Sequence, residues 1–144
     1  MLDKAIALAI EVHNGQKDLA GEPYILHPLR VMMKMKTELE MVVAVLHDVV
    51  EDGHSLKFHL AGFPNEVIIA VYALSRGKRG SNKESYEDYI KRVSKHKLAT
   101  KIKLADLYDN LDPERTALLD PIKNAKRREK YLWAVGYLLS SEGR

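Results

Sequence analysis

Apolar residues recur at helical spacing along most of the chain. Leu2, Ala5, Ile6 and Ala9 repeat every three or four residues, and the pattern stops at Gly15. Similar patterns predict further helices over 28–36, 38–53, 55–63, 64–76, 84–96, 98–111 and 121–141. The run "VIIAV" at 67–71 is the one place where a strand could occur instead. The pattern predicts an all-α fold of seven or eight helices.

Two of these predicted helices carry distinctive apolar positions. Residues 41–46 are apolar on every side, as expected of a helix at the centre of a bundle. The last predicted helix should face inward with Tyr131, Leu132, Val135, Leu138 and Leu139, although its Tyr and Leu side chains would also suit a homo-oligomer interface. No repeat or linker divides the chain, so we expect a single domain over residues 1–144.

The composition limits the class of protein, the metal ligands it can supply and the partners to expect. The 144 residues are 46% hydrophobic and 30% charged, which is typical of a folded protein. There is no cysteine, so a metal would need nitrogen and oxygen ligands. The start of the chain is unlike a signal peptide and no segment has the apolar length to cross a membrane, so we expect a cytoplasmic protein without a membrane partner. A net charge of only +3 argues against a nucleic-acid partner.

The stretch "AVLHDVVEDG" places four ionisable side chains directly after the apolar run: His47, Asp48, Glu51 and Asp52. On a helix, which turns about 100° per residue, these four groups share one sector. Buried together, they need a cation or a hydrogen-bond network to compensate them. An imidazole beside a carboxylate suits Mn²⁺, Fe²⁺ or Zn²⁺.

Two further side chains could complete such a site. His27 stands where a loop enters a helix, and Asp106 is the first acid of another mainly apolar helix. The alternative is that 47–52 is the solvent-facing end of a helix. The apolar run before it and the unfavourable position of acids at a helix C-terminus weigh against that interpretation.

Three motifs together resemble a known family. "PYILHPLRV", "HDVVED" and "KLADLYDN" occur in the order found in HD-domain phosphohydrolases, specifically the hydrolase domain of the RelA/SpoT alarmone enzymes and the small alarmone hydrolases. The similarity extends from "EVHNGQ" to "RREKY". The resemblance implies one compact HD-domain helical bundle and metal-dependent hydrolysis of a phosphorylated nucleotide.

The resemblance also implies roles for individual residues. The metal ligands would be His27, His47, Asp48 and Asp106, and the expected ion is Mn²⁺. Glu51 and Asp52 match an acidic pair that positions or activates the attacking water, and either could instead protonate the leaving oxygen. The candidate substrate contacts are Asn110, Lys17, Tyr24, Arg127 and Tyr131, of which Tyr131 could equally be a core aromatic.

The chain departs from this family near the expected substrate. Asp18 and Leu19 stand where alarmone hydrolases usually carry a basic pair, and Leu107 stands where a basic residue usually follows the metal-binding aspartate. Asp109 and Asp112 add negative charge near the presumed pocket. We therefore expect a changed mode of nucleotide binding. Replacement cations could come from Lys17 or from Arg76, Lys78 and Arg79 in the loop after the fifth predicted helix. That loop could equally be a solvated surface loop without a role in phosphate binding.

Three functions follow as hypotheses. The first is a Mn²⁺-dependent pyrophosphohydrolase that converts guanosine tetraphosphate to GDP and pyrophosphate. The second keeps the metal chemistry but acts on another phosphorylated nucleotide or a small phosphoester. The third is a helical module that binds nucleotide or nucleic acid without hydrolysis, and the retained Glu51 and Asp52 argue against it.

Overall fold

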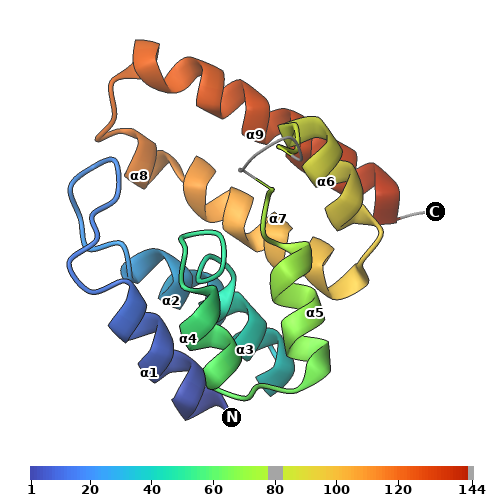
Figure 1. The fold of residues 1–144 in the computed structure, drawn as a ribbon. Helices are drawn as coiled ribbons and strands as arrows, with labels where there is room; N and C mark the ends of the chain where they lie inside the picture. The colour runs from blue at the N-terminus through green and yellow to red at the C-terminus, as the bar shows by residue number, and fades with distance from the viewer. Residues whose placement is uncertain (78–82, 143–144) are drawn as a thin grey trace.

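The computed structural model describes residues 1–77 and 83–142 and confirms the all-α prediction. Within these residues there are nine helices and no β-strand (Figure 1). They are α1 (Leu2–Val12), α2 (Leu26–Met33), α3 (Glu38–Leu46), α4 (Ser55–Leu60), α5 (Asn65–Ala73), α6 (Tyr86–Ser94), α7 (Lys97–Leu111), α8 (Pro113–Thr116) and α9 (Pro121–Glu142). The run "VIIAV" lies in α5. The helix beyond the eight predicted is α8, a single turn with Pro113 at its first position.

Two helices organise the core. Val42 to Leu46 of α3 are fully buried, which confirms the prediction of a central helix. Helix α3 packs against α1, α2 and α5, while α7 lies between these helices and the pair α6 and α9 (Figure 1). Because α3 and α7 also touch each other, the predicted ligands at the end of α3 and in the middle of α7 can meet inside the protein.

The prediction that the third helix continues to Gly53 is wrong, because α3 ends at Leu46. The Ala44 carbonyl, which would accept from the Asp48 amide in a continuous helix, accepts instead from His47, through its backbone N–H at 3.4 Å and its ring Nδ1 at 2.6 Å. Residues 47–53 form successive turns and include one helical-type bond from Asp52 N–H to Asp48 C=O of 2.9 Å. The segment closes at Gly53, where φ is +97°.

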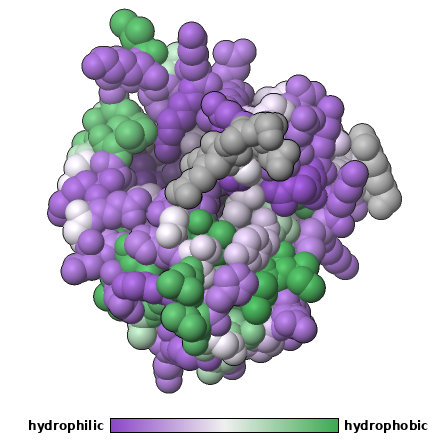
Figure 2. Space-filling view, in the orientation of Figure 1, coloured by the Kyte–Doolittle hydropathy of each residue, from purple (hydrophilic) through white to green (hydrophobic). Residues whose placement is uncertain are grey.

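The last helix buries a narrower stripe than its pattern predicted. Ala134 and Leu138 of α9 are fully buried, with Tyr131 and Val135 partly buried beside them. Leu132 and Leu139 are 45% and 49% exposed, so their predicted inward orientation is wrong. The reason is that α9 packs against α6 and α7 on one side only. The face of the molecule in Figure 2 is mostly hydrophilic, with hydrophobic residues in separate patches.

None of the helices in 1–77 and 83–142 combines the length and the apolarity needed to span a membrane.

A capping box fixes the start of α3 and ties it to α7. The Thr37 hydroxyl accepts from the backbone N–H of Glu40, and the Glu40 carboxylate accepts from the backbone N–H groups of Lys36 and Thr37. The same carboxylate lies 2.7 Å from the Lys101 ammonium of α7. These contacts, the Lys101 hydrogen bond foremost, lower the pKa of Glu40 from 4.5 to about 2.

We predict that Glu40→Gln lowers the free energy of unfolding at neutral pH by about 1 kcal/mol or less, the usual range for an ion pair with an exposed partner. Because the folded-state pKa is depressed, the stabilisation by ionised Glu40 is complete above pH 4.5 and is lost as the pH falls towards 2. Urea unfolding should therefore show the two proteins converging over that range. Glu38→Gln, in the same helical turn, is the control, and a constant difference between wild type and Glu40→Gln would contradict the prediction.

Candidate metal centre and substrate pocket

The four predicted metal ligands converge. Ligand atoms of His27, His47 and Asp48 all lie within 4.8 Å of one another. From α7, Asp106 Oδ1 lies 2.9 Å from His27 Nε2 and 3.5 Å from His47 Nε2. Both histidines and Asp106 are at most 3% exposed. The ends of α2 and α3 and the middle of α7 thus bring two imidazoles and two carboxylates together at a buried point.

The tautomers of the two histidines follow from their other contacts. His47 Nδ1 lies 2.6 Å from the Ala44 carbonyl, and His27 Nδ1 lies 2.6 Å from Asp109 Oδ2. Since both partners are acceptors, each Nδ1 donates, and the lone pair of each neutral ring is on Nε2. His47 Nε2 is buried, and no contact that it makes with the described residues has hydrogen-bond geometry. Imidazole lone pairs that face carboxylates fit a divalent cation.

The electrostatics of the cluster agree with this fit. Burial opposes ionisation of Asp106, but Lys103 and the two histidines outweigh it and hold the pKa of Asp106 well below its usual range. Burial likewise disfavours protonation of His47, and the carboxylates of Asp48 and Asp106 overcome it and raise the pKa of His47. The two ionised acids therefore draw positive charge to this point, either as protons on the histidines or as a cation.

Asp109 supports the cluster in a way that we did not predict from the sequence. It is 2% exposed, and besides His27 it contacts Arg30 Nε at 2.9 Å and Arg115 Nη1 at 2.8 Å. Burial raises the pKa of Asp109, but His27 and the arginines lower it further. The negative charge expected of Asp109 is therefore present, but it is compensated by His27, Arg30 and Arg115. Its spacing of three residues from Asp106 on one helix was the available signal.

Other neighbours fix the ligand carboxylates. Lys103, which the sequence analysis missed, places Nζ 2.7 Å from Asp106 Oδ2, and it also stands three residues from Asp106. Asn110 donates to Asp106 Oδ1 at 3.1 Å, and the Tyr24 hydroxyl donates to Asp48 Oδ2. Two of the candidate substrate contacts, Tyr24 and Asn110, thus bond to the carboxylates of predicted metal ligands, Asp48 and Asp106.

Glu51 and Asp52 lie on the turns that follow the His47–Asp48 pair. Glu51 Oε1 accepts from the backbone N–H of Arg76 at 2.8 Å. Asp52 Oδ2 accepts from Gln16 Nε2 at 3.3 Å and lies 3.8 Å from Nδ1 of the buried His13. Asp52 therefore reaches the pocket wall through Gln16, while Glu51 is fixed by the backbone that leads out of α5.

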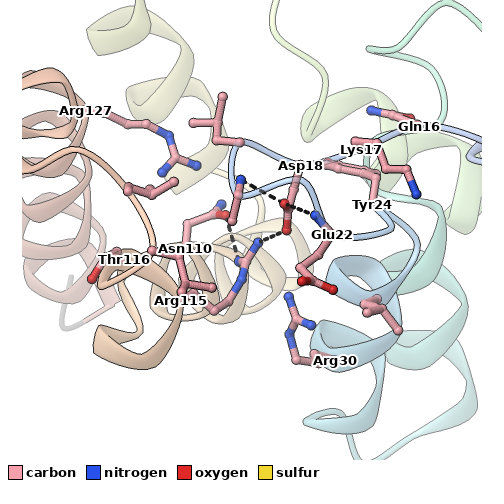
Figure 3. Close-up of a pocket in the computed structure, with 15 residues that line it drawn as sticks. Gln16, Lys17, Asp18, Glu22, Tyr24, Arg30, Asn110, Arg115, Thr116 and Arg127 are labelled. Atoms are coloured by element: carbon pink, nitrogen blue, oxygen red, sulfur yellow. Dashed lines mark hydrogen bonds and ion pairs between the residues drawn. The ribbon is translucent and has the colours of Figure 1, made fainter.

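A pocket of about 390 Å³ lies beside this cluster (Figure 3). Its walls come from the loop before α2, the first turns of α2, the end of α7, α8 and the segment after it, and α9. The lining residues are Gln16, Lys17, Asp18, Leu19, Ala20, Glu22, Tyr24, Leu26, Arg30, Asn110, Arg115, Thr116, Leu118, Leu119 and Arg127. Four of the five candidate substrate contacts are among them. The fifth, Tyr131, packs with its ring centroid 6.2 Å from that of Tyr86 and 4.9 Å from the Arg127 guanidinium.

Among the residues singled out as departures or added charge, Asp18, Leu107 and Asp112 have internal roles, whereas Leu19 is 71% exposed and lines the pocket. Asp18 Oδ1 accepts from the backbone N–H groups of Ala20 and Glu22, both at 2.9 Å, and Asp18 Oδ2 pairs with Arg115 at 3.2 Å. Leu107 is fully buried in the core. Asp112 caps α8 by accepting from Glu114 N–H at 2.9 Å, so its charge is also taken up locally.

The basic loop is only partly described. Lys78 and Arg79, named above as replacement cations, lie outside the described residues. Arg76 is described: its Nε donates to the Glu84 carbonyl at 3.0 Å, and its guanidinium lies 5.6 Å from the centre of the Tyr86 ring.

Comparison with known proteins gives the relatives of this chain. No family model matches it. It is 41% identical over 61 residues to a putative chloroplastic GTP diphosphokinase of Arabidopsis thaliana, covering 40% of this chain and 7% of the relative. It is 33% identical over 122 residues to the guanosine-3′,5′-bis(diphosphate) 3′-pyrophosphohydrolase of Aquifex aeolicus, covering 80% of this chain and 17% of the relative.

A third relative is the bifunctional (p)ppGpp synthase/hydrolase SpoT of Escherichia coli K12, which is 31% identical over 122 residues, covering 76% of this chain and 17% of the relative. The chain therefore spans less than a fifth of the length of these curated relatives. The two bacterial matches extend over most of this chain, and its helical fold and His–Asp cluster agree with the resemblance found in its motifs. The chain is a homologue of the SpoT/RelA family, consistent with an HD-type hydrolase domain that resembles theirs.

Proposed function

We propose that this chain is a Mn²⁺-dependent phosphohydrolase that converts guanosine tetraphosphate to GDP and pyrophosphate. The observation that carries the proposal is the buried convergence of His27, His47, Asp48 and Asp106, with the Nε2 atoms of both histidines directed at carboxylates. The names of two relatives, in Aquifex aeolicus and Escherichia coli, support the choice of nucleotide.

The proposed metal site rests on its donor set. His27, His47, Asp48 and Asp106 would hold the ion, and two imidazoles with two carboxylates suit Mn²⁺ better than a thiolate-seeking metal. When bound, such an ion acidifies water and polarises a phosphoryl oxygen. Asp109, Lys103 and Asn110 keep the ligands oriented through the contacts described above, as neighbours of metal ligands commonly do.

Glu51 and Asp52 would transfer protons and position the attacking water. Glu51 and Asp52 follow the ligands within four residues, and each is held by a neighbour, Glu51 by the Arg76 amide and Asp52 by Gln16. One carboxylate would accept the proton of the attacking water and the other would position that water or protonate the leaving oxygen. Asp52 accepts from Gln16 of the pocket wall, which supports a role for Asp52 on the substrate side of the pair.

The pocket would hold the nucleoside and phosphates next to the cluster. Lys17 and Arg127 bring cations to its wall, and Leu19, Leu26 and Leu119 bring apolar surface that could cover the face of a base. The pocket volume of about 390 Å³ falls within the usual range for small-molecule sites.

A second candidate is hydrolysis of another phosphorylated nucleotide or a small phosphoester. The observation in its favour is that the positive charge expected at positions 18 and 19 is missing. Asp18 and Leu19 replace the expected basic pair, and the Arg115 guanidinium in this wall is already bonded to Asp18 and Asp109. A base would meet a leucine instead of a stacking arginine here.

We predict that the purified protein releases GDP and pyrophosphate from guanosine tetraphosphate with Mn²⁺ and not after chelation, as resolved by chromatography. A panel of other phosphorylated nucleotides is run in parallel. Turnover of one of these with the tetraphosphate untouched would support the second candidate. Binding of nucleotide without turnover of any compound would contradict both enzymatic proposals.

We predict that Asp106→Asn lowers Mn²⁺ affinity by more than about 100-fold, the upper end of the range for partners of metal ligands. The reason is that the variant loses a charged donor to the ion. Titration calorimetry measures the affinity, and circular dichroism checks that the helices persist. Asp88→Asn, an exposed site in α6, is the control. Wild-type affinity in Asp106→Asn would remove this residue from the ligand set.

We predict that Glu51→Gln keeps Mn²⁺ bound while kcat falls by about 10²- to 10⁴-fold, as expected when a general acid or base is removed. The amide preserves an acceptor for the Arg76 N–H but cannot take up a proton. Asp52→Asn, measured in parallel, shows which of the two acids limits the rate. Full activity of both variants would show that the acidic pair has no part in the reaction.

A further inference from the structure

Arg115 joins two parts of the chain that are far apart in sequence, the loop that carries Asp18 and the end of α7 (Figure 3). Its Nη2 donates to Asp18 Oδ2 at 3.2 Å, across 97 residues. Its Nη1 contacts Asp109 Oδ2 at 2.8 Å, the Asp109 carbonyl at 3.1 Å and Asn110 Oδ1 at 3.2 Å. Arg115 is 23% exposed, and Asp18 is 12% exposed, so this is a partly buried contact. The guanidinium thus connects the pocket loop, residues 16–24, to the end of α7.

The same guanidinium supports two of the four proposed ligands. Asp109, which Arg115 contacts, accepts from His27 Nδ1 at 2.6 Å. Asn110, which Arg115 also contacts, donates to Asp106 Oδ1 at 3.1 Å. One residue lies between Arg115 and each ligand. A shift of the guanidinium would therefore move the orientation of an imidazole and of a carboxylate at the proposed metal site.

The pocket loop depends on Asp18 in two separable ways. Its Oδ1 accepts from Ala20 and Glu22 N–H, which closes the turn, and its Oδ2 pairs with Arg115, which fastens the turn to α7 and α8. The base of the loop is closed by the backbone bond from Tyr24 N–H to the Gln16 carbonyl at 2.8 Å. The turn is self-contained, and the Asp18–Arg115 pair is its tie to the C-terminal half of the pocket.

We propose that Arg115 is a positioning residue with two separable roles, one toward the pocket loop and one toward the metal ligands. Through Asp18 it holds the loop that shapes the substrate side of the pocket, and through Asp109 and Asn110 it orients His27 and Asp106. Asp18 is then a specificity-determining residue because it closes the turn of this loop and ties the loop to Arg115. The statements about substrate rest on the proposed function, whereas those about the loop and the metal do not.

The test separates two arms of the proposal: the loop arm is the contact of Arg115 with Asp18, and the metal arm is its contacts with Asp109 and Asn110. Asp18→Asn keeps an acceptor for the two turn amides but removes the charge that pairs with Arg115, so it affects the loop alone. We expect faster amide hydrogen exchange in residues 16–24 and a KM raised about 5-fold, the scale of a weakened bond to a charged group, with Mn²⁺ affinity unchanged. Asp120→Asn is the matched control, because Asp120 Oδ1 also accepts from two backbone amides, those of Ile122 and Lys123.

Arg115→Lys retains the charge but loses the planar fork, so it affects both arms. We expect the same loosening of the loop and, in addition, a Mn²⁺ affinity lowered about 10-fold, as for other changes next to metal ligands. Arg128→Lys, an exposed arginine in α9, is the control. A residue needed only for folding would lower the melting temperature in both variants without this division between KM and metal affinity.

Two results overturn the proposal: wild-type loop exchange in both variants, or unchanged Mn²⁺ affinity in Arg115→Lys. Failure of the proposed function looks different. If the wild-type protein hydrolyses no nucleotide, hydrogen exchange and Mn²⁺ titration still decide the role of Arg115. If it binds no Mn²⁺ either, the metal arm is refuted, because there is no metal site to orient, and hydrogen exchange decides the loop arm.

Discussion

The structure depends on compensating the charge of two carboxylates, Asp48 and Asp106, inside a helical core. Unpaired acids at this depth would cost several kcal/mol each. The fold compensates them by placing two imidazoles and the Lys103 ammonium within hydrogen-bonding distance or close to it. This explains why α3 must be central and why α7 must cross it. The helices that supply opposite charges have to meet where water is excluded, and the capping box and Lys101 help to hold them there.

The need to compensate buried charge extends from the His–Asp cluster to the wall of the pocket. Asp109 supports His27, and its own charge requires Arg30 and Arg115. Arg115 in turn engages Asp18 at the rim of the pocket. Each of these acids is paired with at least one base, so the polar network runs from the buried cluster to the pocket wall without an isolated charge among these residues. A continuous set of contacts therefore links the pocket wall to the buried His–Asp cluster.

The features that could be predicted from the sequence are those set by residues close together in the chain, and the features that were missed depend on individual side-chain bonds or on distant contacts. Helical periodicity identified the bundle, and the juxtaposition of His47 and Asp48 with an apolar run identified the cluster, because both are local patterns. The end of α3 was missed because it depends on a side-chain bond from His47 to Ala44 that periodicity does not register. The narrow buried stripe of α9 was missed because it depends on how few helices cover that helix. Arg115 was missed because its partner Asp18 is 97 residues away.

Asp18 shows why a substitution in a motif cannot be interpreted from the motif alone. Compared with the basic residue usual in alarmone hydrolases, an aspartate at this position suggests a weaker attraction for substrate phosphates. In the structure it closes a turn through two backbone amides and pairs with an arginine that also bonds to Asp109 and Asn110. An arginine introduced at position 18 would lose both amide bonds and face Arg115 directly, so it would repel the residue that supports Asp109. The position is thus constrained by its partner across the pocket, and the substrate preference of the chain has to be explained by the pair instead of by Asp18 by itself.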